Sequence, residues 1–238
     1  MPMSSAEIKE LRRLANEFVD GLQSDYKSVL MALTQKAYKD GLSHAEKSIG
    51  KISATERNKV YESLPDMQTY LVNRIQPAIS SIRDDLMSTL NKCISQGMDA
   101  SKTKIALRKR ANFLSEHITF NSVGKTYDAA DVINGVLVPT KRTVTRAKTM
   151  STDSYFDIIA RDVSKMSYIM AKVNGFREKG YNGFQYRRKR DNKVRKSHRA
   201  MGGKKFYIDS PEAKLAYQLL LDYGCRCDIT PIKLRSKR

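Results

Sequence analysis

The sequence predicts an α+β protein in which a long-helix N-terminal region is followed by a small C-terminal α+β domain. Much of residues 1–100 places apolar side chains at three- and four-residue steps, as amphipathic helices do. Residues 151–238 combine helical patterns with short aromatic segments of two-residue spacing, which are typical of strands. The charge is also divided. Residues 1–100 hold 13 Lys and Arg against 13 Asp and Glu, so the whole formal net charge of +19 lies in residues 101–238.

The first predicted helix begins at a capping box, in which Ser4 precedes Glu7 by three residues. Its apolar pattern continues past Gly21 and fades near Gly41, where we expect the helix to end. The stripe that faces its partner starts with Ile8, Leu11, Leu14, Ala15, Phe18, Val19 and Leu22.

Two further helices are predicted before residue 100. A short one covers 55–64 and ends at Pro65, and a third runs from Met67 to about Gln96. Pro77 lies inside the third helix, where it should kink or split it, because proline lacks the backbone donor of the helical ladder. Helices with one apolar stripe and charge-balanced outer faces form a bundle or provide a docking surface for a larger assembly.

Residues 99–150 begin with a basic helical segment and continue with Gly, Pro and β-branched residues that indicate loop and strand. We place a domain boundary near residue 150. Residues 1–150 then form a mainly helical docking region, first neutral and then basic, and residues 151–238 form the basic α+β domain.

The C-terminal domain is predicted to start with a helix that Ser151 or Thr152 caps and that stops at Asn174-Gly175. Two aromatic strands follow. A short helix then has Pro211 in its first turn, and "CRCDITPI" forms a closing strand.

The composition excludes some classes of protein. No run approaches twenty apolar residues, and the first residues lack the apolar core of a signal peptide, so we expect no membrane partner. The chain has an odd number of cysteines, Cys93, Cys225 and Cys227, and Cys93 lies far from the other two in the sequence. This pattern predicts no disulfide framework and a protein folded in a reducing cytoplasm.

A basic run is the strongest candidate for binding. Eight basic residues and one acid lie between Arg187 and Arg199, beside Phe184 and Tyr186, which we expect to be exposed. Such a run suits phosphate backbones without sequence specificity, whereas the alternative is a solvated charge run. The nucleic-acid-binding candidates are Arg187, Arg188, Lys189, Arg190, Lys193, Lys196 and Arg199.

His198, Cys225 and Cys227 raise the question of a metal. Alternate strand positions share a face, so the two cysteines point the same way and, with His198, offer three zinc ligands, to which Asp191 could add a fourth. The alternative is that both thiols are small buried apolar groups and the polar residues frame the fold. We predict no catalytic residue and no cofactor, and leave zinc open through His198, Cys225 and Cys227.

Over about residues 157–232 the chain resembles the C-terminal domain of the Mu F-like minor head proteins of tailed phages, also called head morphogenesis proteins. The resemblance rests on an aromatic strand, Asp-x-x-Val-Arg-x-x-His, a later Gly and a terminal Cys-Arg-Cys. A Leu-rich helix precedes Cys-Arg-Cys where the family commonly has Pro- or His-containing loops, which removes further metal ligands. The matching residues are Asp191, Val194, Arg195, His198, Gly203, Cys225, Arg226, Cys227 and Pro231.

The resemblance implies a minor capsid protein, present in few copies, in the capsid interior or at the portal vertex of the virion, and in the host cytoplasm during assembly. Its implied partners are the portal protein, major capsid or scaffold proteins, and packaged double-stranded DNA. Two alternatives stay open. One is a metal-dependent nuclease or toxin-like enzyme that uses Asp191, His198, Cys225 and Cys227, and the other is a free-standing nucleic-acid-binding protein.

Overall fold

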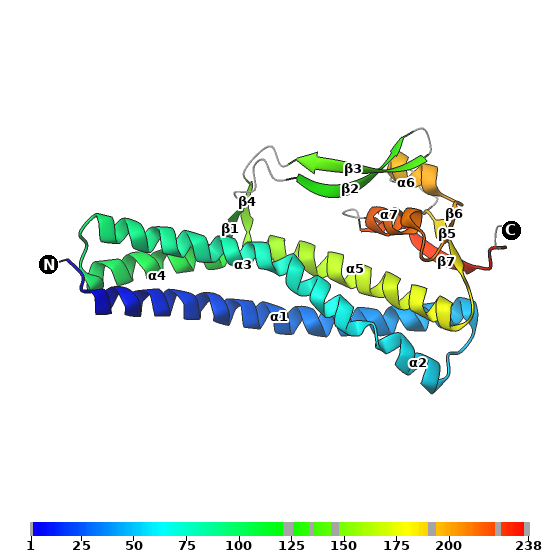
Figure 1. The fold of residues 1–238 in the computed structure, drawn as a ribbon, viewed down its shortest axis with the longest axis horizontal. Helices are drawn as coiled ribbons and strands as arrows, with labels where there is room; N and C mark the ends of the chain where they lie inside the picture. Colours follow the sequence, from blue (N-terminus) through cyan, green and yellow to red (C-terminus); the bar gives the residue numbers. More distant parts are fainter. Residues whose placement is uncertain are drawn as a thin grey trace. The chain divides into compact units, whose positions relative to one another are not determined.

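The computed structural model describes residues 2–120, 126–133, 136–143, 148–189, 194–221 and 225–235. It confirms the α+β class, with long N-terminal helices followed by a region of small sheets and further helices (Figure 1). The chain forms two compact units, each assembled from three separate segments. Unit 1 contains residues 1–31, 70–123 and 144–159, and unit 2 contains 32–69, 124–143 and 160–238. The linear boundary near residue 150 stays a prediction.

Unit 1 is built on residues 5–31 of α1 (Ser5–Ile49), residues 70–95 of α3 (Leu64–Ser95) and the whole of α4 (Ala100–Glu116), which lie side by side in Figure 1. The predicted capping box begins α1, because the backbone N–H of Ser4 donates to Glu7 and the N–H of Glu7 donates to the Ser4 hydroxyl. The apolar stripes face inward, as burying them stabilises the bundle. Their buried members include Leu11, Ala15, Val19, Leu30, Leu71, Ile75, Ile79, Ile82, Leu86, Leu90, Leu107 and Leu114.

Two ion pairs and a short β-ribbon add to unit 1. Arg110 of α4 binds Asp85 of α3 with an Nε–Oδ1 distance of 2.6 Å, and Arg83 of α3 binds Asp20 of α1 at 2.7 Å. The ribbon pairs β1 (His117–Phe120) with β4 (Lys148–Ser151) in antiparallel register. None of the described helices is long and apolar enough to cross a membrane.

The helix ends near prolines differ from the prediction. The short helix α2 (Ala54–Tyr61) ends before Pro65, and Pro65 lies in the first turn of α3, where its missing N–H costs no hydrogen bond. Pro77 does not split α3, which runs unbroken from Leu64 to Ser95.

Two glycines that predicted helix ends lie inside helices. Helix α1 continues past Gly41 to Ile49, and α5 (Thr152–Glu178) continues past Gly175 until Gly180, whose φ of 71° favours glycine. A Cβ on Gly41 would lie 2.3 Å from the backbone oxygen of Tyr168 on α5. The predictions of ends at Gly41 and Gly175 were therefore wrong, because both glycines allow close packing between α1 and α5.

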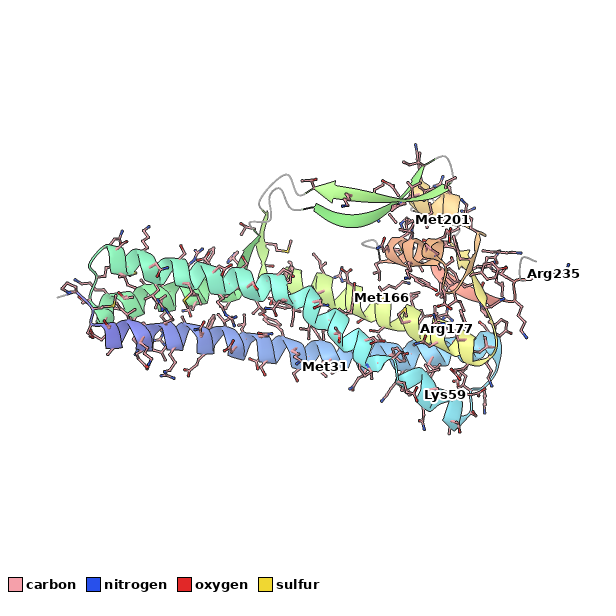
Figure 2. All side chains as sticks on the ribbon, viewed as in Figure 1. Met31, Lys59, Met166, Arg177, Met201 and Arg235 are labelled. Carbon is pink, nitrogen blue, oxygen red and sulfur yellow. The ribbon has the colours of Figure 1, made fainter. Side chains whose placement is uncertain are left out.

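Unit 2 contains a sheet of order β6-β5-β7, formed by β5 (Gly183–Arg187), β6 (Lys205–Tyr207) and β7 (Asp228–Ile232), all antiparallel. Helix α7 (Pro211–Leu220) contacts the hairpin of β2 (Thr126–Ile133) and β3 (Val136–Thr143). Helix α5 also supplies core residues, and Figure 2 labels Met166 and Arg177 on its part within this unit. The core includes Ile169, Val173, Phe176, Phe184, Tyr186, Met201, Ala216, Leu219 and Ile229.

The beginning of α2 provides a test of pH dependence. Ser53 and Glu56 form a capping box, and Lys179, which directly follows α5, donates to Glu56 at 2.9 Å. These interactions lower the pKa of Glu56 to about 2. The hydrogen bond from the backbone N–H of Ser53 contributes most, and the hydrogen bond from the Lys179 ammonium comes next. Because the folded-state pKa is depressed, the carboxylate stabilises the fold above about pH 4.5 and loses that contribution as the pH falls toward 2.

We therefore expect Glu56→Gln to be less stable than the native chain at pH 7, with the difference shrinking between pH 4.5 and pH 2. Urea unfolding at stepwise lower pH measures this. Glu62→Gln, which changes the same charge at the C-terminal end of α2, is the control. An undiminished Glu56→Gln difference at pH 2 would contradict the assignment.

Candidate functional site

The strand that precedes the basic run turns its aromatic residues inward. Along β5, Phe184 and Tyr186 are fully buried, whereas Arg187 at its end is exposed. The expectation that Phe184 and Tyr186 are exposed beside the run was wrong. Two-residue alternation places them on the core face, so they are not available to stack on nucleic-acid bases.

The basic candidates in the described residues are all exposed. Arg187, Arg188 and Lys189 end or follow β5, and Lys196 and Arg199 belong to α6 (Lys196–Met201), where Figure 2 labels Met201. In the described part of the chain, no carboxylate forms an ion pair with any of these five. The predicted residues Arg190, Asp191 and Lys193 lie outside the described residues.

A tight turn brings the end of α6 back to β5. Gly203 has a φ of 85°, a conformation that favours glycine, and its N–H donates to the carbonyl oxygen of Tyr186 at 2.9 Å. A Cβ on Gly202 would meet Cδ of Arg188 at 2.5 Å, so the Arg188 side chain lies directly over this turn. The turn therefore places basic residues from both ends of the run on one small region of unit 2.

Four polar side chains meet beneath this region. His198 of α6 is 2% exposed, and its Nδ1 lies 2.9 Å from the Tyr186 hydroxyl. The same nitrogen lies 3.4 Å from Sγ of Cys225 and 3.7 Å from Sγ of Cys227. We name these residues, Tyr186, His198, Cys225 and Cys227, the His–Cys cluster.

The cysteines reach the cluster from a segment that is not a strand. The closing strand was predicted from Cys225, but β7 starts at Asp228, so that boundary was wrong. The backbone N–H of Cys227 instead donates to Sγ of Cys225 at 3.4 Å, which bends the segment and directs both sulfurs toward His198. Of the remaining motif residues, Val194 is half-buried, and Arg195 and Arg226 are exposed.

The two thiols have opposite acidities. The pKa of Cys227 is lowered, first because the Cys225 thiol hydrogen-bonds to its sulfur and then because His198 does, although burial opposes this. The pKa of Cys225 is raised by that same hydrogen bond and by burial. Cys227 is therefore the more acidic thiol of the two, but it is only 2% exposed. A nucleophile must reach its substrate, so this arrangement suits a ligand better than a catalytic thiol.

A cavity of about 500 Å³ reaches the cluster within unit 2. It is lined by residues of α1, α5 and α7 and by Cys225, among them Asp40, Arg161, Lys165 and Tyr168. Lys165 donates to the carbonyl oxygen of Cys227 at 2.8 Å.

Lys165 and Lys172 were not singled out as site residues by the sequence analysis, which followed only the apolar stripe of α5. Lys172 donates to Asp228 at 2.8 Å. The polar residues Arg161, Lys165 and Lys172 recur at four- and seven-residue steps along the same helix, and that spacing is the signal that could have found them.

Comparison with known proteins identifies a family of related sequences. The family of phage Mu protein F like proteins matches residues 84–230, which include most of the motif region and the preceding α4 and β2–β3 hairpin. No curated protein and no solved structure shows a significant match to the chain. The family match covers more than half of the chain, and the chain therefore belongs to the Mu F-like family of phage head morphogenesis proteins.

Proposed function

We propose that this head morphogenesis protein is a minor capsid protein that docks at the portal vertex or inner shell and contacts packaged double-stranded DNA non-specifically. The observation that carries the proposal is the charge of unit 2. Unit 1 has 14 Lys and Arg against 11 Asp and Glu, whereas unit 2 has 30 against 14. A surface with this excess attracts a polyanion such as DNA.

The exposed basic residues support the DNA contact more directly. Among the residues that the structure describes, no carboxylate pairs with these guanidinium and ammonium groups, and exposed groups of this kind bind phosphate oxygens and release condensed counterions from DNA. The buried positions of Phe184 and Tyr186 leave phosphate contact as the main interaction available near the run. Phosphate contacts position a protein on DNA but carry no sequence information, which suits a protein that meets a whole genome.

The docking half of the proposal rests on unit 1. Its exposed helical surface is nearly neutral overall, and Val29, Ile105 and Phe113 are apolar side chains that remain at least 40% exposed there. We expect co-purification with the portal protein of the phage that encodes the chain. DNA binding without affinity for portal or capsid protein would contradict this half and favour a free-standing nucleic-acid-binding protein.

For the DNA half, we expect the triple variant Arg187→Gln, Arg188→Gln, Lys189→Gln to bind duplex DNA more weakly and with a flatter salt dependence. Each lost phosphate contact reduces the slope of log K against log salt by about 0.9, so three contacts reduce it by about 3. Fluorescence anisotropy with labelled duplexes of unrelated sequence over a salt series measures both quantities.

A charge-matched control separates local contact from general attraction. The variant Lys9→Gln, Lys27→Gln, Lys109→Gln removes three exposed charges from unit 1, and its salt slope should stay near that of the native chain. Equal slopes for the two triple variants would overturn the assignment to the Arg187–Arg199 run. Cleavage of the DNA in the presence of Mg²⁺ or Zn²⁺ would instead support the nuclease alternative.

A further inference from the structure

Nδ1 of His198 in the His–Cys cluster has more polar neighbours than it can hydrogen-bond. Nδ1 of a neutral imidazole carries either one hydrogen or one lone pair, so it forms one good hydrogen bond. Three groups nevertheless lie around this single nitrogen: the Tyr186 hydroxyl at 2.9 Å, Cys225 Sγ at 3.4 Å and Cys227 Sγ at 3.7 Å. Buried polar groups are normally paired, and here one nitrogen has three possible partners, two of which are thiols.

The same distances agree with a tetrahedral metal site. Zinc binds thiolate sulfur at about 2.3 Å and imidazole nitrogen at about 2.0 Å, so two such ligands at a tetrahedral angle are separated by about 3.5 Å. The observed N–S distances of 3.4 and 3.7 Å lie on either side of that value. All three ligand atoms lie within 4.8 Å of one another.

We propose that Nδ1 of His198 and the sulfurs of Cys225 and Cys227 ligate a zinc ion that joins α6 to the segment before β7. On binding, Zn²⁺ replaces the thiol protons, which leave to solvent, and the two thiolates balance its charge. A site made of thiolate and imidazole ligands binds zinc in preference to Mg²⁺ or Ca²⁺, which favour oxygen ligands. The N–H of Cys227, which donates to Cys225 Sγ, stabilises a thiolate at that sulfur.

Two candidates for the fourth zinc ligand lie within unit 2. The Tyr186 hydroxyl already lies beside Nδ1, and the cavity that Cys225 lines can supply a water molecule. In either case the ion connects α6 to the Cys225–Cys227 segment, whose Cys225 lies 27 residues beyond His198 in the sequence, and the Tyr186 hydroxyl as fourth ligand adds β5. We infer a structural role, because zinc that crosslinks such elements stabilises a small domain.

Cobalt provides the first test, since Co²⁺ occupies zinc sites and reports its ligands by absorption. The purified full chain is stripped of metal with a chelator under reducing conditions and titrated with Co²⁺. We expect one equivalent to produce a near-ultraviolet thiolate-to-cobalt band and the visible bands of tetrahedral Co²⁺, both abolished by Zn²⁺. Zn²⁺ should also raise the melting temperature by several degrees.

The absence of a thiolate-to-cobalt band in the folded native chain would overturn the proposal, and so would octahedral bands from surface carboxylates alone. This measurement needs no variant, so it decides the matter even where a substitution prevents folding.

Matched cysteine variants locate the site. Cys225→Ser and Cys227→Ser should each lose the one-equivalent cobalt band or weaken Co²⁺ binding at least tenfold, whereas Cys93→Ser should keep it, because Cys93 belongs to α3 in unit 1. Tyr186→Phe should retain the thiolate band, and a change in its visible bands would identify the hydroxyl as the fourth ligand. A native-like titration of Cys225→Ser and Cys227→Ser would contradict the assignment.

Discussion

Gly41→Ala is expected to lower the free energy of unfolding by about 3 kcal/mol, the upper end of the usual cost of overpacking. The added Cβ would lie 2.3 Å from the carbonyl oxygen of Tyr168 and 2.8 Å from its Cα. These atoms belong to the backbone of α5, so no side-chain rotation relieves the clash. The two helices must separate along the stretch where Leu42 and Ala45 are buried.

Chemical denaturation monitored by circular dichroism measures the effect. The control is Gly21→Ala on the same helix, because a Cβ at Gly21 meets no atom within 4 Å. We expect this control to gain up to about 1 kcal/mol, since alanine is the better helix former. Equal stability of the two variants would show that α1 and α5 do not pack closely at Gly41.

Asp228→Asn is expected to cost about 3 kcal/mol, because it leaves the ammonium of Lys172 buried without its counter-charge. Both carboxylate oxygens of Asp228 lie 2.8 Å from Nζ of Lys172, whose side chain is 3% exposed. Asp228 itself is 30% exposed, and for that reason we place the cost at the lower end of the range for broken buried pairs.

The pH dependence of that variant has a definite sign. Burial lowers the pKa of Lys172 in the native chain, and Asp228 opposes the shift. Asparagine carries no charge to raise the pKa of Lys172, so in the folded variant that pKa falls further below the ordinary 10.5. Between that lower pKa and about 10.5 the unfolded chain binds more protons than the folded chain, and stability therefore rises with pH.

We expect the deficit of Asp228→Asn to be full near pH 7 and to narrow as the pH rises toward 10. Urea unfolding of both proteins at several pH values measures it. Asp209→Asn is the control, because its partner Arg177 is 42% exposed and the pair contributes little in water. A deficit that stays constant up to pH 10 would contradict the burial of an unpaired ammonium.

The sequence alone determined the local structure of this protein. The capping box at Ser4 and Glu7 was predicted from the sequence and is present in the structure, and Leu11, Ala15 and Val19 of the predicted first stripe are buried. Helix starts and amphipathic stripes depend on residues within a few positions of each other, so the local sequence is enough to predict them. The Asp-x-x-Val-Arg-x-x-His and Cys-Arg-Cys segments likewise identified the family, which the match over residues 84–230 confirms.

Tertiary packing decided what the glycines at 41 and 175 do. A glycine in a helical pattern predicts an end because it favours other backbone conformations. At Gly175, however, the side chains of Leu42, Ile52 and Ala45 lie within 3.5 Å of the position that a Cβ would take. Both glycines are used for close contact, and the sequence does not contain that information locally.

Tertiary structure also decided the arrangement of the His–Cys cluster. The sequence supplied His198, Cys225 and Cys227 as metal-ligand types, but residue spacing says nothing about distance across a sheet. Only the pairing of β5 with β7 and the turn at Gly203 bring the sulfurs of Cys225 and Cys227 to within 4 Å of Nδ1 of His198, with Tyr186 beside them. The chemistry of the residues comes from the sequence, and their convergence comes from long-range contacts that only the folded chain makes.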